Sequence, residues 1–260
     1  MRIMTNNIWG NYFDNPPIER SENLIHIYDE YKPDVIGFQE VKDDWYETSL
    51  FPFLSKEYRF IGTEFLFHNN DRHVPIAVKK ELNIVAYGFE YLTDTPDCSK
   101  AISWVVLQSL VNQTYFAICN THFWWKKGEE HDRIRAINAQ QLSDRMWQIH
   151  QKYNCPVYAM GDMNTTLDSE VFTIFANNEI IDLYDVAERR KDRCSLHGDP
   201  KRDEKGVFRG YTTIKGHVES IDHIVALKNG YTVKEYWVIE DQEALDATDH
   251  SPVYVDIEIE

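Results

Sequence analysis

Polar side chains that can bind a metal ion or orient water follow several apolar stretches of this 260-residue sequence. Glu40 comes directly after one such stretch, and another ends in Gly161-Asp162-Met163-Asn164. Because Asp162 and Asn164 are two residues apart, their side chains on an extended backbone point to the same side and can hold one water or one phosphoryl oxygen. Carboxylate and amide oxygens, with several retained waters, are the ligands that Mg²⁺ prefers. These residue types are compatible with a Mg²⁺ site, or with Mn²⁺, but Glu40 alone also fits a cap and Gly-Asp-Met-Asn alone also fits a plain turn.

Two histidines have a similar placement. His122 follows the apolar stretch Tyr115–Thr121, and His250 precedes the last one. A histidine accepts a proton well when a carboxylate fixes its tautomer and stabilises its imidazolium form. Asp222 lies in an apolar segment, where an unpaired carboxylate is costly, so it is the expected partner of a histidine. We expect His223 to leave that strand on the opposite face and to be structural.

Several common catalytic arrangements lack support in the sequence. It contains neither the G-x-S-x-G nucleophile elbow nor the phosphate-binding G-x-x-x-x-G-K-[ST] motif. Its four cysteines form no C-x-x-C pair, which argues against a disulfide framework or a zinc site. Reduced, buried thiols are typical of a cytoplasmic protein, and no apolar leader follows Met1. We therefore expect a cytoplasmic protein, whose secretion would require a leader removed from this chain.

The net charge of −16 bears on the class of substrate. Nucleic-acid binding depends on neutralising phosphates with Lys and Arg, so this acidic chain is poorly suited to a long duplex. A divalent cation or a small phosphate ester is compatible with the charge. The most basic stretch, Glu188–Lys205, is either a solvated surface loop or a loop that contacts substrate phosphate. No apolar run approaches the roughly 20 residues of a membrane span.

Short apolar stretches dominate the chain and predict strands, with few helices between them. Two packed sheets with helices outside them fit this pattern better than a doubly wound sheet does. We therefore expect one α/β domain over residues 1–260. The predicted strands are Arg2–Ile8, Val35–Gln39, Arg59–Phe67, Pro75–Val78, Asn83–Tyr91, Ile102–Leu110, Tyr115–Thr121, Pro156–Gly161, Ile221–Ala226, Thr232–Val238 and Pro252–Ile259. The predicted helices are Pro17–Tyr31, Asp43–Leu54, Glu130–Gln151 and Asp168–Asn177.

The polar clusters, taken in this order, resemble those of the endonuclease/exonuclease/phosphatase superfamily. This superfamily includes DNase I-like nucleases, exonuclease III-type enzymes, neutral sphingomyelinases and inositol polyphosphate 5-phosphatases. Each motif alone also fits an ordinary turn or cap, but the clusters from Asn7 to Pro252 follow the family's order. The resemblance implies a DNase I-like, four-layer α/β/β/α sandwich, with two central mixed sheets flanked by helices and a site at one end between the sheets.

The resemblance also implies residue roles at the metal. Glu40 is similar to the family's principal Mg²⁺ ligand, and Asn7 is similar to the amide beside it. Asp249 resembles a residue that lies near the metal. These three side chains form the metal site that the resemblance implies.

The implied catalytic residues come from both halves of the chain. Asp162 and Asn164 match the pair that orients the attacking water and the phosphate. Asp222 and His250 resemble the family's Asp–His dyad. His122 matches the histidine that contacts the phosphate or protonates the leaving group. Either Asp162 or His250 removes the proton of the water, and the sequence leaves both assignments open.

Three positions depart from the family's pattern. In DNase-like members a glutamate supports the histidine equivalent to His122, and here only Asp71 could serve. Val74 and Lys100 stand where related bacterial members often carry Asn and Arg. Lysine is a point charge rather than a bidentate fork, so the departure at Lys100 concerns substrate binding rather than the metal site.

The leading hypothesis is a Mg²⁺-dependent phosphodiesterase or phosphatase that uses metal-assisted, in-line attack of water. Its substrate would be a small molecule, a phospholipid headgroup or a single-stranded nucleic acid, and we expect a monomer. Lys100, Trp124 and Trp125 are the substrate-binding candidates, since the two indoles either stack on a base or sugar ring, meet a lipid surface, or pack at the base of their loop. One alternative is a DNA or RNA nuclease, and another is an inactive scaffold of the same fold.

Overall fold

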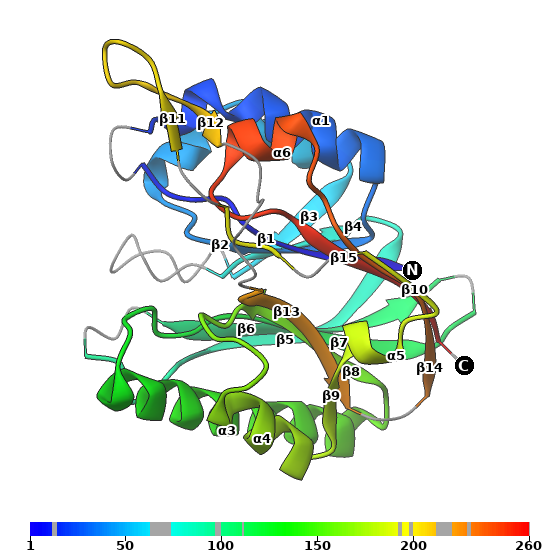
Figure 1. Ribbon diagram of the computed structural model, residues 1–260. Helices are drawn as coiled ribbons and strands as arrows, with labels where there is room; N and C mark the ends of the chain where they lie inside the picture. The colour runs from blue at the N-terminus through cyan, green and yellow to red at the C-terminus, as the bar shows by residue number, and fades with distance from the viewer. Residues whose placement is uncertain are drawn as a thin grey trace.

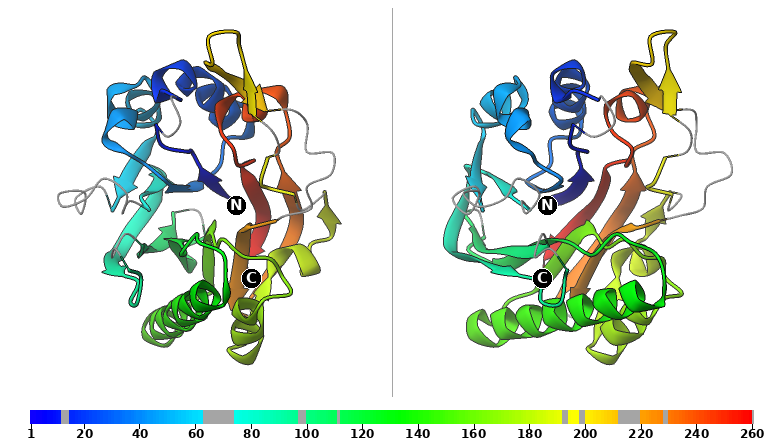
Figure 2. Two further views of the ribbon diagram at one scale, coloured as in Figure 1. Left: turned by 60° about the vertical axis from the view of Figure 1, so that its left-hand side comes forward. Right: turned by 90° about the vertical axis from the view of Figure 1, so that its left-hand side faces the viewer.

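Two mixed β-sheets pack face to face at the centre of the protein, and helices cover the outer face of each sheet (Figures 1 and 2). The computed structural model describes residues 1–11, 15–62, 74–96, 100–110, 112–191, 194–197, 200–211, 220–227 and 230–259. The layers follow the order helix, sheet, sheet, helix. The expected four-layer α/β/β/α sandwich is confirmed.

The first sheet has seven strands, with the first and last strands of the chain side by side near its middle. In spatial order they are β10 (Arg189–Arg190), β14 (Tyr231–Val238), β15 (Val253–Ile259), β1 (Arg2–Asn7), β2 (Val35–Gln39), β4 (Ile76–Lys79) and β3 (Tyr58–Ile61). β1 pairs in parallel with β2 and antiparallel with β15. β2 is buried along its whole length, which explains its uninterrupted apolar sequence.

The second sheet has six strands. In spatial order they are β5 (Leu82–Tyr91), β6 (Ala101–Ser109), β7 (Tyr115–His122), β8 (Val157–Asp162), β13 (Asp222–Leu227) and β9 (Ile180–Asp182). β7 and β8 are parallel, and β8 pairs antiparallel with β13. A separate two-stranded hairpin consists of β11 (Pro200–Arg202) and β12 (Phe208–Tyr211).

The helices bury apolar faces against the two sheets. α3 (Glu129–Tyr153) packs Ala139, Leu142 and Met146 on the second sheet at helical spacing. α1 (Ser21–Tyr31) covers the first sheet and ends at Lys32, whose left-handed φ of 46° precedes Pro33. The other helical segments are η1 (Pro17–Glu19), η2 (Asp43–Glu47), α2 (Leu50–Leu54), α4 (Glu170–Asn177), α5 (Leu183–Val186) and α6 (Gln242–Ala247). Within the described residues, no helix is long and apolar enough to cross a membrane.

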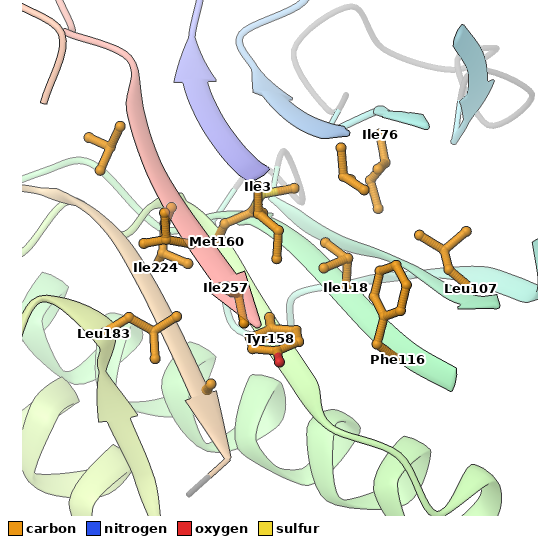
Figure 3. Close-up of a cluster of buried hydrophobic side chains, with 14 of the residues drawn as sticks. Ile3, Ile76, Leu107, Phe116, Ile118, Tyr158, Met160, Leu183, Ile224 and Ile257 are labelled. Atoms are coloured by element: carbon orange, nitrogen blue, oxygen red, sulfur yellow. The ribbon is translucent and has the colours of Figure 1, made fainter. Parts of the chain in front are cut away.

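Apolar side chains from both sheets fill the space between them. Figure 3 shows Ile3 of the first sheet beside Met160 and Ile224 of the second, all of them fully buried. The ring of Tyr158 lies at the same interface, which continues to Phe116. This core holds the two sheets in a fixed relation, so side chains at the sheet ends can be placed against each other.

A polar bridge joins the two sheets at one end. Asn120 of β7 is fully buried, donates to the backbone carbonyls of Phe38 and Pro75 at 2.9 and 3.1 Å, and accepts from Gln39 at 2.6 Å. Gly37 faces this amide so closely that a Cβ there would lie 2.6 Å from its oxygen. Because a buried polar group requires partners, this bridge fixes how the two strand ends face each other.

Each predicted strand has a counterpart within the described residues, with its ends shifted, whereas two predicted helices are divided: Pro17–Tyr31 into η1 and α1, and Asp43–Leu54 into η2 and α2. β3 is described as far as Ile61, and the remainder of the predicted Arg59–Phe67 lies mostly outside the described residues. On α3, Ile137 lies outside the apolar face and is 41% exposed. The short elements β9, β10, β11, β12, α5 and α6 are not predicted, since each has too few residues to show a period.

Candidate active site

Three of the candidate residues form one row across the end of the second sheet. His122 of β7 is level with Asp162 of β8, and Asp222 of β13 is level with Asp162 on its other side. Residues that are level on neighbouring strands present their side chains to the same face. The His122 Nε2 atom lies 3.3 Å from the Asp162 Oδ2 atom, and all three residues are buried.

The first sheet supplies Asn7 and Glu40 from neighbouring strand ends. Asn7 closes β1 and donates from Nδ2 to the Asp162 Oδ2 atom at 3.0 Å, which links the two sheets. Glu40 follows β2 with a left-handed φ of 58°, and its carboxylate accepts from the backbone N–H of Gly10 at 3.4 Å. Asn164 also has a left-handed φ, of 50°. Non-glycine residues rarely adopt this conformation, and they concentrate at functional sites.

His250 comes from the loop before β15 and meets Asp222. The Nδ1 atom of His250 lies 2.8 Å from Asp222 Oδ2, and its Nε2 atom lies 3.9 Å from Asp162 Oδ2. Burial opposes charging of this imidazole, but the carboxylates of Asp222, Asp249 and Asp162 outweigh it and raise the pKa of His250 well above its usual 6.5. The imidazole is therefore a cation at neutral pH, oriented by its partner carboxylate.

The carboxylates of the site are crowded. Burial, together with the charges of Asp222 and Glu40, raises the pKa of Asp162 to about 6, although His250 opposes this. Burial, together with the charge of Glu40, raises the pKa of Asp249 to about 7, although His250 opposes this. Asp222 also keeps a buried carboxylate oxygen, Oδ1, with no donor among the described residues. Within the described residues, the carboxylates of Glu40, Asp162, Asp222 and Asp249 thus outnumber the cations His250 and Arg20 that act on them.

The donor set fits a divalent metal ion. Glu40, His122 and Asp162 each offer one ligand atom, and these atoms lie within 4.8 Å of one another. Asp162 also forms such a group with Asp222 and His250. A hard cation would supply the positive charge that the crowded carboxylates lack, and oxygen donors are those that Mg²⁺ and Mn²⁺ prefer.

His122 lies between Lys100 and Asp162. The Lys100 Nζ atom is 3.1 Å from both ring nitrogens of His122, and both side chains are buried. Burial, followed by the charges of Lys100 and His250, lowers the pKa of His122 well below its usual 6.5. The ring is therefore neutral at neutral pH. Asp71, the expected carboxylate partner of His122, lies outside the described residues.

The remaining candidates lie around this centre. The backbone N–H of Asn164 donates to Asp162 Oδ1 at 2.9 Å, and its side chain donates to the carbonyl of Phe123 at 3.1 Å. Trp124 is buried and its indole N–H donates to His131 at 3.0 Å, so its ring packs inside the loop rather than facing a substrate. Trp125 is 57% exposed.

Several residues that the sequence analysis did not select support the site. The Ser195 hydroxyl accepts the backbone N–H groups of Ile221 and Asp222 at 3.2 and 3.1 Å, and His197 Nε2 lies 2.7 Å from the Ser251 hydroxyl. Ser195 and His197 lie in the basic stretch Glu188–Lys205, for which the sequence predicts either a solvated loop or a loop that contacts substrate phosphate. The signal that could have found them is an uncharged Cys-Ser-Leu-His run inside that charged stretch.

Arg20 is a second unselected residue, and it links two loops of the site. Its guanidinium is 2% exposed and donates to the carbonyls of Ile8 at 2.9 Å and Trp9 at 2.6 Å in the loop after Asn7. It also donates to the carbonyl of Ala247 at 2.6 Å, just before the loop that carries His250. An arginine in a predicted surface helix gives no sequence signal of such burial.

The sequence is similar to that of a known nuclease. Over 150 residues the chain is 28% identical to exodeoxyribonuclease III of Haemophilus influenzae, a match that covers 56% of this chain and 52% of that enzyme. The matched segment thus spans about half the length of that relative.

Solved structures share the fold over the whole chain. An endonuclease/exonuclease/phosphatase from Bacteroides vulgatus superimposes with a TM-score of 0.78 at 20% identity, covering 100% of this chain and 98% of that one. A mannosyl-6-phosphatase of Bacteroides thetaiotaomicron gives 0.73 at 19% identity, with 100% of both chains covered. The catalytic domain of human Nocturnin gives 0.74 at 20% identity, covering 100% and 94%. The family model of endonucleases, exonucleases and phosphatases matches residues 4–250, and the chain belongs to this family.

Proposed function

We propose that this protein is a Mg²⁺-dependent hydrolase of small phosphate esters. The observation that carries the proposal is the position of Asp162. Its carboxylate accepts a hydrogen bond from Asn7 of the first sheet. It also lies 3.3 Å from His122 Nε2 and 3.9 Å from His250 Nε2. A buried carboxylate that is oriented by an amide N–H and lies near two imidazoles can orient water for attack on phosphorus.

Glu40, with Asn7 and Asp249 beside it, would hold the ion, which would offset the charge of the phosphoryl group. The fit rests on the crowding of the carboxylates and the raised pKa values of Asp162 and Asp249. Mn²⁺ satisfies the same donors.

Of the two candidates for the general base, Asp162 and His250, we assign Asp162. Its pKa of about 6 lies close to neutral pH, where a base combines availability with proton affinity. The pKa of His250, raised well above its usual value, keeps that imidazole protonated. We therefore assign Asp162 to accept the water proton and His250 to donate a hydrogen bond to a phosphoryl oxygen.

His122 acts as a neutral link in this proposal. Its lowered pKa disfavours an imidazolium that would protonate the leaving group. With Lys100 donating to one ring nitrogen, the Nε2–H faces Asp162 Oδ2 at 3.3 Å. His122 and Asn7 would then hold Asp162 in one orientation, with the backbone N–H of Asn164 on its second oxygen.

The charge of −16 supports a small ester over a long nucleic acid. A mannosyl-6-phosphatase among the solved relatives supports a phosphomonoester. One observation favours the alternative, a nuclease, namely the 28% identity to exodeoxyribonuclease III. An activity that falls steeply with added salt would favour the nuclease.

The test is hydrolysis of p-nitrophenyl phosphate, bis-p-nitrophenyl phosphate, single-stranded RNA, DNA and sphingomyelin, each with Mg²⁺. Glu40→Ala should lose at least ~10²-fold in turnover, the scale of one electrostatic contribution. Glu30→Ala, an exposed glutamate on α1, is the matched control and should stay within about twofold. Equal activity in the two variants would remove Glu40 from the mechanism, and no product from any substrate would refute the proposed function.

A further inference from the structure

A hollow of about 650 Å³ opens directly beside His250 and Asn164. Its walls come from the loop between β7 and α3, the first turns of α3, and the loop between β8 and α4. α3 and α4, which carry these walls, lie side by side under the second sheet (Figure 1). Leu196, Ile221 and Val171 add apolar surface to the lining. Its volume is within the range of small-molecule sites, and its contact with His250 places an occupant next to the phosphoryl position.

Hydroxyl groups line the side formed by the β8–α4 loop. Thr165, Thr166 and Ser169 all contribute to the lining. The Ser169 hydroxyl precedes α4 but caps no backbone N–H of that helix. Its oxygen is inaccessible to water and has no partner among the described residues. A buried hydroxyl without a partner loses a hydrogen bond, and rotation of the Ser169 side chain toward the hollow would let a ligand hydroxyl restore it.

The charged groups of the lining disfavour a second anion. Asp132, Asp168 and Glu170 line the hollow together with Lys127 and Arg135. The guanidinium of Arg135 is buried and already donates to the carbonyls of Trp124 and Lys126 and to Asp132. Its N–H groups are therefore not available for a bidentate hydrogen bond to a second phosphate. The carboxylates of Asp168 and Glu170, in contrast, are exposed acceptors. A polyanion would be repelled here, while hydroxyl donors would be bound.

The aromatic lining favours a neutral group over an organic cation. Trp125 is 57% exposed and is the aromatic residue of the lining. Recognition of a quaternary ammonium uses a cage of several rings, and the neighbouring Trp124 is buried outside this lining. A single indole face suits instead the apolar C–H face of a sugar ring.

We propose that this hollow holds the sugar of a sugar phosphate monoester, an inference that rests on the proposed function. Water would add to phosphorus as the bond from phosphorus to the sugar oxygen breaks. The products would be inorganic phosphate and the free sugar, whose new hydroxyl takes up one proton while the water gives up one. The sugar hydroxyls would form hydrogen bonds with the carboxylates of Asp168 and Glu170 and with the hydroxyl of Ser169.

The test compares hexose 6-phosphates with p-nitrophenyl phosphate, which carries no sugar hydroxyls. The wild-type enzyme should hydrolyse at least one of glucose, mannose, fructose and galactose 6-phosphate with a higher kcat/KM than p-nitrophenyl phosphate. Ser169→Ala and Asp168→Ala should each lower the ratio of these two kcat/KM values about 5- to 10-fold, mainly through KM, the scale of one lost hydrogen bond. Thr173→Ala removes an exposed hydroxyl of α4 outside the lining and should leave the ratio unchanged.

The outcomes separate the two proposals. Hydrolysis of p-nitrophenyl phosphate with no preference for any hexose phosphate would overturn the sugar site and leave the proposed function standing. An unchanged ratio in both lining variants would also overturn it. A stronger preference for phosphocholine than for every hexose phosphate would assign the hollow to a cation and overturn the inference. Failure to hydrolyse p-nitrophenyl phosphate and every hexose phosphate would overturn both.

Discussion

The two ends of the β-sandwich are built from the same sheets but differ in how their charges are paired. At the end opposite to Asp162, a hollow of about 740 Å³ is lined by Met1, Lys79, Lys80 and Asp34, among others. There Lys79 pairs with Asp34 at 3.0 Å, Lys80 donates to two backbone carbonyls, and the amino terminus donates to the carbonyl of Ile257. This end has the larger hollow, and each of these charged groups has a hydrogen-bonding partner.

The site end shows the opposite balance. Its carboxylates are buried in excess, so Asp162 and Asp249 hold protons at a pH where aspartates are normally ionised. The comparison teaches that unbalanced buried charge, rather than the volume of a hollow, indicates where the chemistry lies.

The largest contrast should come from the same substitution at the two ends. Asp162→Asn should lower kcat about 10³-fold or more, because it removes the proposed base while keeping the shape of the side chain. Asp34→Asn at the far end should leave kcat within about twofold and cost some stability through its pair with Lys79. Steady-state kinetics on p-nitrophenyl phosphate measures both. Comparable losses in the two variants would erase the proposed difference between the ends.

Arg20 should give the next largest effect. It donates to carbonyls of the loop after Asn7 and to Ala247, so it holds two site loops in register. A lysine lacks the fork of donors, and Arg20→Lys should lower kcat about 10- to 10²-fold. Arg145→Lys is the matched control, because Arg145 makes a two-armed pair with Glu90 away from the site. A loss of melting temperature in Arg20→Lys without any loss of kcat would make Arg20 a purely structural residue.

The pH profile of kcat should show the crowding of the carboxylates directly. Asp162 must be ionised to accept a proton, and burial raises its pKa to about 6. Bound Mg²⁺ favours the ionised carboxylate, so the acid limb of kcat should lie at or below about pH 6 and above the usual value for aspartate, with a fall of roughly tenfold per pH unit. Measurement of kcat between pH 4.5 and 8 with a substrate of constant charge tests this. A kcat that stays constant or rises as the pH drops to 4.5 would contradict the assignment of Asp162 as the base.

Much of this site could be predicted from the sequence because its residues stand at the ends of recognisable strands. Glu40, Asp162 and Asp222 each adjoin an apolar run whose burial the structure shows. Their convergence follows from strand register, since Asp222 and Asp162 are level on paired strands. The order of the motifs also identified the family, and hence the two-sheet architecture.

The supporting contacts could not be predicted, for physical reasons. Arg20 and Ser195 act through backbone carbonyls and N–H groups, which every residue has, so their partners leave no trace in the sequence. Burial of Trp124 beside exposed Trp125 depends on how one loop folds against α3, and the residue types are identical. The left-handed φ of Glu40 likewise has no signature, since glutamate is not a residue that favours it.

The smallest effect should be on thermal stability, and it depends on Mg²⁺ and pH. The pKa values of Asp162 and Asp249, about 6 and 7, exceed their ordinary 3.8, so the folded state binds protons more tightly than the unfolded chain. The metal-free protein should therefore lose stability as pH rises through 6 to 7. At pH 8 a cation relieves this repulsion, whereas at pH 5 it must displace protons. Saturating Mg²⁺ should raise the melting temperature by about 5 °C at pH 8 and by much less at pH 5.

The same glutamate substitution at the two ends sharpens this measurement. Glu40→Gln should abolish most of the Mg²⁺-dependent shift at pH 8, because it removes the proposed principal ligand. Glu57→Gln, in the lining of the far hollow, should retain it in full. If Mg²⁺ shifted both variants equally, the ion would be acting on the acidic surface as a whole, since a surface effect does not depend on which end loses a carboxylate. If only Glu57→Gln retains the Mg²⁺-dependent rise in melting temperature, the ion binds at the end where Asp162 lies.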